Sequence, residues 1–217
     1  MMEFRNLKKE EIEVRISRVT SKSVSVLLYK DARCDMKILD ETVGPENWQR
    51  NHEVINGNLF CNVGILTDNG WIWKQDVGVE SYTEAQKGEA SDSFKRACFN
   101  WGIGRELYTA PYITFTEGQC RINDNKCYDR FYVDDIEIEE KKIIKLRVVN
   151  KNTGSAFEYE QPAKIDAPKV NVIKNDIKDG LIDEAKLLAS FKIAKIEDMT
   201  EKQFRKYAEQ KQKKGTK

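Results

Sequence analysis

The sequence predicts an α+β fold in which an antiparallel β-meander packs against one long amphipathic helix. Three strand-like runs, residues 48–55, 59–67 and 71–77, are separated by Asn-Gly-Asn and Asp-Asn-Gly turns, whose residues tolerate a positive φ. The following run, residues 90–101, places apolar side chains at intervals of three and four, which is the period of a helix with one buried face. One face of the meander needs cover, and we expect this helix to supply it.

Two strands and a short helix are expected before the meander. Residues 12–19 alternate apolar and charged side chains and residues 23–29 are apolar and β-branched, so both runs favour strands that pair as a hairpin. A short helix at the start of the chain is the alternative. Residues 31–43 carry apolar side chains at helical spacing, and Gly44 and Pro45 end this predicted helix.

The long helix has clear start and end signals. Thr83 and Gln86 form a capping box, so the helix is expected to begin near Glu84, and Gly102 and Gly104 end it. The apolar side chains expected on its buried face are Ala90, Phe94, Ala97, Cys98 and Trp101.

A second β-hairpin region is predicted after this helix. Residues 131–138 and 143–149 are strand-like and flank a charged turn, and a third run at 155–160 follows an Asn-Thr-Gly turn. The core domain is therefore expected to span residues 1–161.

A linker and a basic helical tail are expected beyond the core domain. Residues 162–180 contain two prolines around a polar stretch without periodicity, which is typical of a linker. Residues 181–217 are expected to form helices at 181–191 and 201–212, the second opened by another capping box. From Pro168 onward the chain has 13 Lys and Arg against 8 Asp and Glu, and the preceding residues have 24 against 28. The region before Pro168 is therefore slightly acidic, so any nucleic-acid interface in it must come from local clustering of cations.

Composition disfavours several classes of protein. No run of about 18 apolar residues occurs and residues 1–13 alternate charges, so we expect neither a membrane span nor a signal peptide. We therefore expect an intracellular protein. The five cysteines are scattered without a C-x-x-C spacing, so we expect reduced thiols, mostly in the core. A zinc site that recruits the single histidine, His52, would lack paired close ligands.

Catalytic patterns are scarce. One histidine excludes most histidine-based triads, and neither a triphosphate-binding loop nor a complete dinucleotide-binding loop is present. The best enzymatic alternative is a metal-dependent nuclease in which Asp135, Glu139 and Glu140 hold magnesium beside Lys141. The other interpretation is a solvated hairpin tip, because a charge run at a turn usually faces water.

Residues 71–108 contain three motifs whose joint order is specific. A strand ends in Asp-Val-Gly, a helix bears Lys-Gly-Glu-Ala and then Phe-Lys-Arg-Ala, and an aromatic and glycine exit reads Trp-Gly-Ile-Gly-Arg. In these motifs the chain resembles the Rad-fifty-two-like single-strand annealing proteins, including the phage-type recombinases of that superfamily. The likeness extends more loosely over residues 25–110.

The resemblance implies a β-β-β-α core whose subunits associate side by side into rings or helical filaments, with single-stranded DNA in a basic groove. It implies ATP-independent binding of single-stranded DNA and annealing of complementary strands in homologous recombination and DNA repair, with no cofactor and no catalysis. Expected partners are single-stranded DNA and further copies of the chain, with a single-strand-binding protein or an exonuclease as open alternatives. The expected location is the cytoplasm of a bacterial or phage-infected cell.

The resemblance also transfers DNA-contacting residues motif by motif. The Lys-Arg pair that contacts the DNA backbone falls on Lys95 and Arg96, the earlier helix lysine on Lys87, and a groove arginine approximately on Arg33. Helix geometry supports the pair, because at about 100° per residue both side chains leave the stripe that contains Phe94. Lys87 falls about 20° from Phe94 on that stripe, so it reaches DNA only if the helix overhangs the sheet or the side chain snorkels.

Three further side chains are candidates on local grounds. Lys74 lies on the strand face opposite Trp71 and Trp73 and is expected to add a phosphate contact. Arg105 follows a pair of glycines that bring the backbone close to DNA. Trp73 is a candidate for base stacking, with burial in the core as the alternative.

Two functional questions stay open in the sequence. A passive single-stranded DNA-binding or recombination-mediator module would cover DNA without annealing it. The basic tail either contacts a partner protein or adds DNA affinity, and a flexible solubilising appendage is the alternative.

Overall fold

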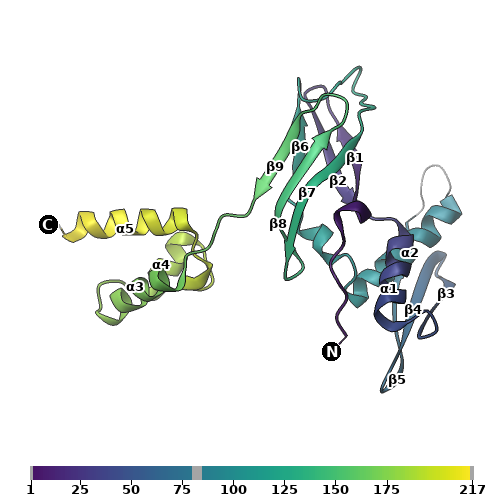
Figure 1. The fold of residues 1–217 in the computed structure, drawn as a ribbon, viewed down its shortest axis with the longest axis horizontal. Coiled ribbons are helices and arrows are strands. Elements are labelled where there is room, and N and C mark those ends of the chain that lie inside the picture. The colour runs from purple at the N-terminus through teal and green to yellow at the C-terminus, as the bar shows by residue number, and fades with distance from the viewer. Residues whose placement is uncertain (1, 80–84, 216–217) are drawn as a thin grey trace. The chain divides into compact units, whose positions relative to one another are not determined.

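The computed structural model describes residues 2–79 and 85–215 (Figure 1). The chain divides into two compact units, Met1–Glu160 and Gln161–Lys217. The first unit contains two antiparallel sheets with helices, so the predicted α+β class is confirmed.

The larger sheet of the first unit has six antiparallel strands in the order β6-β2-β1-β7-β8-β9. The strands are β1 (Glu13–Val19), β2 (Ser23–Tyr29), β6 (Ile113–Thr116), β7 (Phe131–Glu139), β8 (Lys142–Asn150) and β9 (Ala156–Glu160). The predicted hairpin of β1 with β2 is confirmed. The four-residue strand β6 was not predicted; it pairs with β2 from Val26↔Ile113 to Ser23↔Thr116. A run this short has too little alternation to be recognised without its partner strand.

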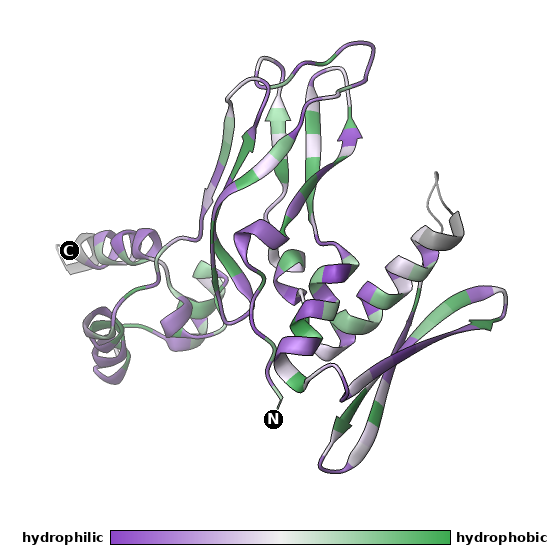
Figure 2. Cartoon of the chain, turned by 45° about the vertical axis from the view of Figure 1, so that its right-hand side comes forward, coloured by the Kyte–Doolittle hydropathy of each residue, from purple (hydrophilic) through white to green (hydrophobic). Residues whose placement is uncertain are grey.

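The smaller sheet contains β3 (Trp48–Ile55), β4 (Asn58–Thr67) and β5 (Gly70–Val77), in that order. Its first turn places Asn56 and Gly57 at positive φ, as the Asn-Gly signal predicts. The helix α2 (Ala85–Trp101) follows and packs on β4 and β5. Figure 2 shows α2 running alongside this sheet with hydrophobic bands along the helix.

The two faces of the small sheet differ in their cover. The buried side chains of β4 are Cys61, Val63 and Ile65, and those of α2 are Phe94, Ala97 and Cys98. Register pairs Val63 with Lys74 and Gly64 with Trp73, so Lys74 lies on the helix-covered face and Trp73 on the other. Trp71 and Trp73 are accordingly 40% and 45% exposed.

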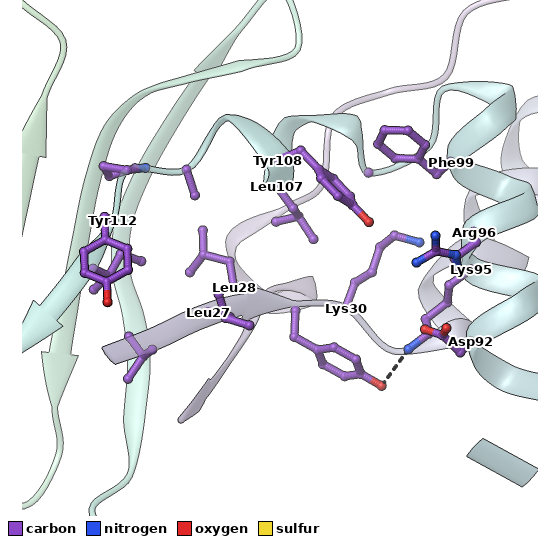
Figure 3. A pocket seen from close by; sticks show the side chains of 16 residues that line it. Leu27, Leu28, Lys30, Asp92, Lys95, Arg96, Phe99, Leu107, Tyr108 and Tyr112 are labelled. Atoms are coloured by element: carbon purple, nitrogen blue, oxygen red, sulfur yellow. Dashed lines mark hydrogen bonds between the residues drawn. The ribbon is translucent and has the colours of Figure 1, made fainter. Parts of the chain in front are cut away.

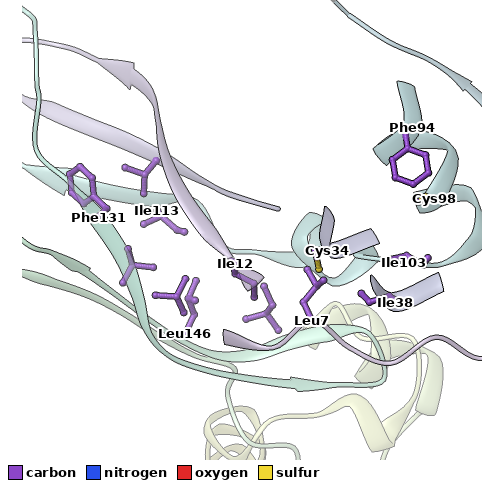
Figure 4. Packing of buried hydrophobic residues seen from close by; sticks show 14 of the residues in the cluster. Leu7, Ile12, Cys34, Ile38, Phe94, Cys98, Ile103, Ile113, Phe131 and Leu146 are labelled. Atoms are coloured by element: carbon purple, nitrogen blue, oxygen red, sulfur yellow. The ribbon is translucent and has the colours of Figure 1, made fainter. Parts of the chain in front are cut away.

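The core of the first unit is continuous from the large sheet to the helices (Figure 4). Buried side chains of the sheet, such as Ile113 and Leu146, belong to the same cluster as Phe94 of α2 and Ile38 of α1 (Ala32–Val43). Two short 3-10 helices, η1 (Lys9–Glu11) and η2 (Arg105–Thr109), complete this unit.

All five cysteines are free and buried, as expected. Burial raises the pKa of Cys61 to about 11 and that of Cys98 well above its ordinary value. These thiols therefore stay protonated near neutral pH and serve as core side chains.

The second unit has its own hydrophobic core. It contains α3 (Ala167–Lys178), α4 (Glu184–Phe191), η3 (Ile196–Asp198) and α5 (Glu201–Gly215). Buried side chains from all of these elements and their connections form a separate cluster, namely Ile165, Val170, Ile173, Leu187, Ile196, Met199 and Tyr207. The predicted capping box at the start of α5 is confirmed, since the Gln203 backbone N–H donates to Thr200 Oγ1 (3.3 Å) and the Thr200 N–H to Gln203 Oε1 (2.8 Å).

The stretch expected to be a linker, residues 162–180, instead contains α3. Asp166 caps this helix by accepting a hydrogen bond from the Lys169 backbone N–H, and Pro168 lies in the first turn, where its missing N–H costs nothing. Two prolines around a polar stretch are typical of a linker, but in the first turn Pro168 favours a helix start.

Within residues 2–79 and 85–215, none of the helices combines the length and the apolar character that crossing a bilayer requires.

Candidate nucleic-acid interface

A groove of about 530 Å³ opens between α2, η2 and the end of β2 (Figure 3). One end carries the cations Lys95, Arg96 and Lys30 beside Asp92. The remainder is apolar and aromatic, and Tyr112 lies at the end away from the cations. The side chains come from two separate segments of the sequence, residues 26–30 and 92–113, so the groove exists only in the folded chain.

Lys95 projects from α2 into the groove and is held there by an aromatic ring. Its Nζ donates a hydrogen bond to Tyr29 Oη at 3.1 Å and lies 4.3 Å from the centre of the same ring. The guanidinium of Arg15 lies 3.5 Å from that ring centre, so Tyr29 contacts two cations. Lys95 is only partly buried, and an ammonium group has three donors, so capacity remains for a further acceptor.

Arg96 also lines the groove and keeps unused donors. Its Nε lies 3.6 Å from Asp76 Oδ1, close enough for an ion pair and too far for a good hydrogen bond. Among the described residues this buried Nε has no hydrogen-bond partner, although the side chain as a whole is 43% exposed. The exposed part of this guanidinium presents its N–H donors in a planar fork, which suits a phosphate that accepts two parallel hydrogen bonds.

Lys30 forms part of the groove floor and was missed by sequence reasoning. It is 6% exposed and its Nζ donates to Oδ1 of Asp35, which is fully buried. The other Asp35 oxygen has no hydrogen-bond partner in the described part of the chain. Burial raises the pKa of Asp35 to about 6, although Lys30 and Lys95 oppose this shift.

The side chain of Lys30 passes directly beside Gly104. The φ of Gly104 is +75°, and a Cβ added there would lie 2.4 Å from Lys30 Cε. The positive φ favours glycine, and a larger residue would also require the end of the Lys30 side chain to shift. Helix α2 ends at Trp101, as the Gly-Ile-Gly exit predicts. The Lys30 side chain lies against the second of these glycines, and an approach of DNA to this backbone stays a prediction.

Lys74 and Arg105 lie at the C-terminal end of α2. Lys74 Nζ and Arg105 Nη2 each donate to the Asn100 carbonyl at 2.9 Å, and Arg105 Nε donates to the Phe99 carbonyl at 2.9 Å. These carbonyls belong to the last turn of the helix, and that of Phe99 also accepts a hydrogen bond from the Gly102 backbone N–H. Both cations therefore stabilise the helix terminus.

Other transferred or expected residues are not among the described residues that line this groove. Arg33 is exposed in the first turn of α1 and, like Lys74 and Arg105, is not among the described residues that line the groove. Trp73 stacks on Trp71 with ring centres 6.0 Å apart, on the uncovered sheet face. Lys87 belongs to α2 by its backbone, but its side chain, and Thr83 of the expected capping box, lie outside the described residues.

Two of the side chains on which the nuclease alternative rests, Asp135 and Lys141, have other partners. Asp135 Oδ2 lies 3.0 Å from Lys145 Nζ, and Lys141 Nζ donates to the backbone carbonyls of Phe4 and Arg5 at 2.6 and 2.9 Å. As far as the structure describes the chain, no three His, Cys, Asp or Glu side chains are placed to hold a metal ion.

Comparison with known families gives a match across residues 4–125 to the Rad52/22 family of double-strand break repair proteins. The match covers more than half of the chain and includes every residue of the groove. The chain belongs to this family.

The chain is also similar to the single-stranded DNA-binding protein DdrA of Deinococcus radiodurans. The two are 38% identical over 89 residues, which are 40% of this chain and 42% of that protein. The chain thus matches about two fifths of the length of this relative.

Proposed function

We propose that the chain binds single-stranded DNA along the groove and anneals complementary strands without hydrolysing a nucleotide. The observation that carries the proposal is the pairing of Lys95 and Arg96 in a groove that lies wholly within the family-matched residues. The name of DdrA, a single-stranded DNA-binding protein, supports the same ligand. We infer that β3, β4, β5 and α2 form the β-β-β-α core of the fold.

The cations act on the phosphates of the strand. Lys95 and Arg96 lie next to each other in the sequence and leave the helix about 100° apart, so they contact neighbouring phosphates. Each contact releases condensed counterions, which gives affinity independent of base sequence and sensitive to salt. The base edges stay free to pair, and base pairing supplies the free energy of annealing.

Assembly of several copies multiplies the contacts of one short groove. A groove of about 530 Å³ holds only a few nucleotides, so one copy binds weakly. Copies side by side in a ring or filament convert successive contacts into intramolecular ones. The remaining alternative is a passive binder or recombination mediator, which covers the strand without accelerating annealing.

Two measurements test the proposal on the full chain. Complementary labelled oligonucleotides should anneal faster with the protein than without it and without ATP; an unchanged or slower rate selects the passive binder. Replacing Lys95 and Arg96 together by Ala should weaken binding about tenfold or more and lower the slope of log affinity against log salt by about 1.4. Lys37→Ala is the matched control, because Lys37 is exposed on α1 outside the groove and is 58% accessible.

A nuclease would show itself in the same samples. Cleavage of DNA with magnesium that is lost in Glu139→Ala would overturn the proposal. No step proposed here uses a metal or a nucleotide cofactor.

A further inference from the structure

Besides its cations, the groove carries two exposed tyrosines to which phosphate binding assigns no role. Tyr108 of η2 and Tyr112, just before β6, line the groove and are 72% and 76% exposed. Leu27 of β2 lines it as well and is 59% exposed. Large aromatic rings usually contribute by burial, so two that stay open beside a cationic groove need another explanation.

Both rings are held in place although they are exposed. The ring of Tyr108 packs on Phe99 of α2, with ring centres 4.6 Å apart and the planes tilted by 55°. The hydroxyl of Tyr112 lies 2.8 Å from Ser25 Oγ and forms a hydrogen bond with it. Neither ring therefore has to be ordered when a ligand arrives, which lowers the entropic cost of binding.

One face of β2 links the tyrosine-lined part of the groove to the part that carries the cations. Ser25, Leu27 and Tyr29 alternate on β2, so the side chain that fixes Tyr112, the exposed leucine and the ring under Lys95 share a face. In Figure 3 Tyr112 lies at one end of the groove, Lys95 and Arg96 lie at the other, and Tyr108 lies between them. A strand along the groove would thus meet phosphate-binding groups first and apolar ring surfaces next.

We propose that Tyr108 and Tyr112 stack on unpaired bases of the strand whose phosphates lie at Lys95 and Arg96. This inference rests on the proposed function and adds the chemical group that the groove recognises, an unpaired nucleobase. Stacking on tyrosine is independent of base identity, because every base has a π-face. Duplex DNA cannot offer these faces, since its bases are stacked on one another. The annealed product therefore loses these contacts, and the groove favours the single strand over the duplex.

The test compares a dT oligonucleotide with an abasic deoxyribose-phosphate oligonucleotide of equal length. The wild-type chain should bind the dT oligonucleotide about tenfold more tightly or better, from the usual strength of one or two base stacks. Replacing Tyr108 and Tyr112 together by Ala should abolish this preference. Replacing them together by Phe should preserve it, because the rings remain. An Ala double variant that keeps the full preference would overturn the inference.

A second measurement uses the wild-type chain, so it does not depend on the variants folding. A 2-aminopurine base in the oligonucleotide should lose fluorescence on binding if it stacks on a ring, and unchanged fluorescence at saturation would count against stacking. The inference can fail alone: binding that needs Lys95 and Arg96 but ignores the bases would leave the proposed function standing. If the wild-type chain binds neither oligonucleotide, both fall.

Discussion

Two pairs of cations lie on or beside α2, and they differ in what they contact. Lys95 and Arg96 face the groove, where Lys95 rests on the ring of Tyr29 and Arg96 has only the long ion pair with Asp76 and no hydrogen bond from Nε to another described residue. Lys74 and Arg105 donate to the last carbonyls of the helix. All four belong to the segment that resembles the annealing proteins, and charge alone does not separate them. The comparison shows that a lysine or arginine within reach of a helix C-terminus is engaged by its carbonyls before any ligand arrives.

Lys30 gives the most stringent test of this difference, since it lines the groove and also forms an ion pair with Asp35. Replacing Lys30 by Met should lower the free energy of unfolding by about 3–5 kcal/mol, because it leaves the Asp35 carboxylate buried without its partner. Urea denaturation at pH 7 measures this, with the exposed Lys37→Met as the control. A small loss of stability with a large loss of DNA affinity would instead place Lys30 with the groove cations.

The pH dependence of Asp35→Asn sharpens the role of that pair. In the folded chain the pKa of Asp35 is raised from 3.8 to about 6, so the folded state holds the proton more tightly than the unfolded state. The contribution of Asp35 to wild-type stability should therefore fall as pH rises from about 4 to 6 and then level off. Asn does not ionise, so the stability difference should shift in favour of the variant by on the order of 3 kcal/mol over this window. Denaturation at a series of pH values tests this, and a parallel pair of curves would contradict it.

Gly104→Ala tests how closely the Lys30 side chain packs against Gly104. The positive φ and the contact with Lys30 together should destabilise the fold by about 2 kcal/mol or more. Gly118→Ala is the matched control, because its φ is +89° but nothing lies within 4 Å of the added Cβ, so only the backbone cost of about 1 kcal/mol is expected. Equal losses in thermal or urea denaturation would show that Lys30 moves aside freely.

The smallest effects should come from the helix-end cations. Lys74→Met and Arg105→Met should each cost about 0.5–1 kcal/mol of stability, the usual contribution of a cation at a helix C-terminus. Affinity for single-stranded DNA should change by less than about twofold, since both groups face carbonyls. Lys95→Met should show the opposite pattern. A loss of salt-dependent DNA affinity in Lys74→Met would remove the distinction between the two pairs.

Local chemistry predicted most of the fold of the first unit. The Asn-Gly turn and the apolar period of α2 identified strands and helix within one or two residues, because these signals act between near neighbours. The missed elements are β6, whose evidence is a distant partner strand, and α3, whose proline lies in the first turn and resembles a linker signal when read without the cap.

The candidate site could be predicted only in part. Adjacent motif residues such as Lys95 and Arg96 were found, since a helix fixes their direction. Lys30, Tyr108 and Tyr112 were not, because they meet Lys95 only through the packing of β2 and η2 around α2. The exposed position of Trp73 was also undetermined, since alternation assigns side chains to two faces without saying which face the helix covers.

The separate core of residues 161–217 has a consequence for how this gene can be altered. Every groove residue precedes Gln161, and the buried side chains of the second unit come from its own helices and their connections. A cut at Pro168 would break α3, whereas a boundary after Glu160 respects both hydrophobic clusters. Recombination between related genes at that boundary would exchange the C-terminal unit as a whole. The residues of the groove would not change.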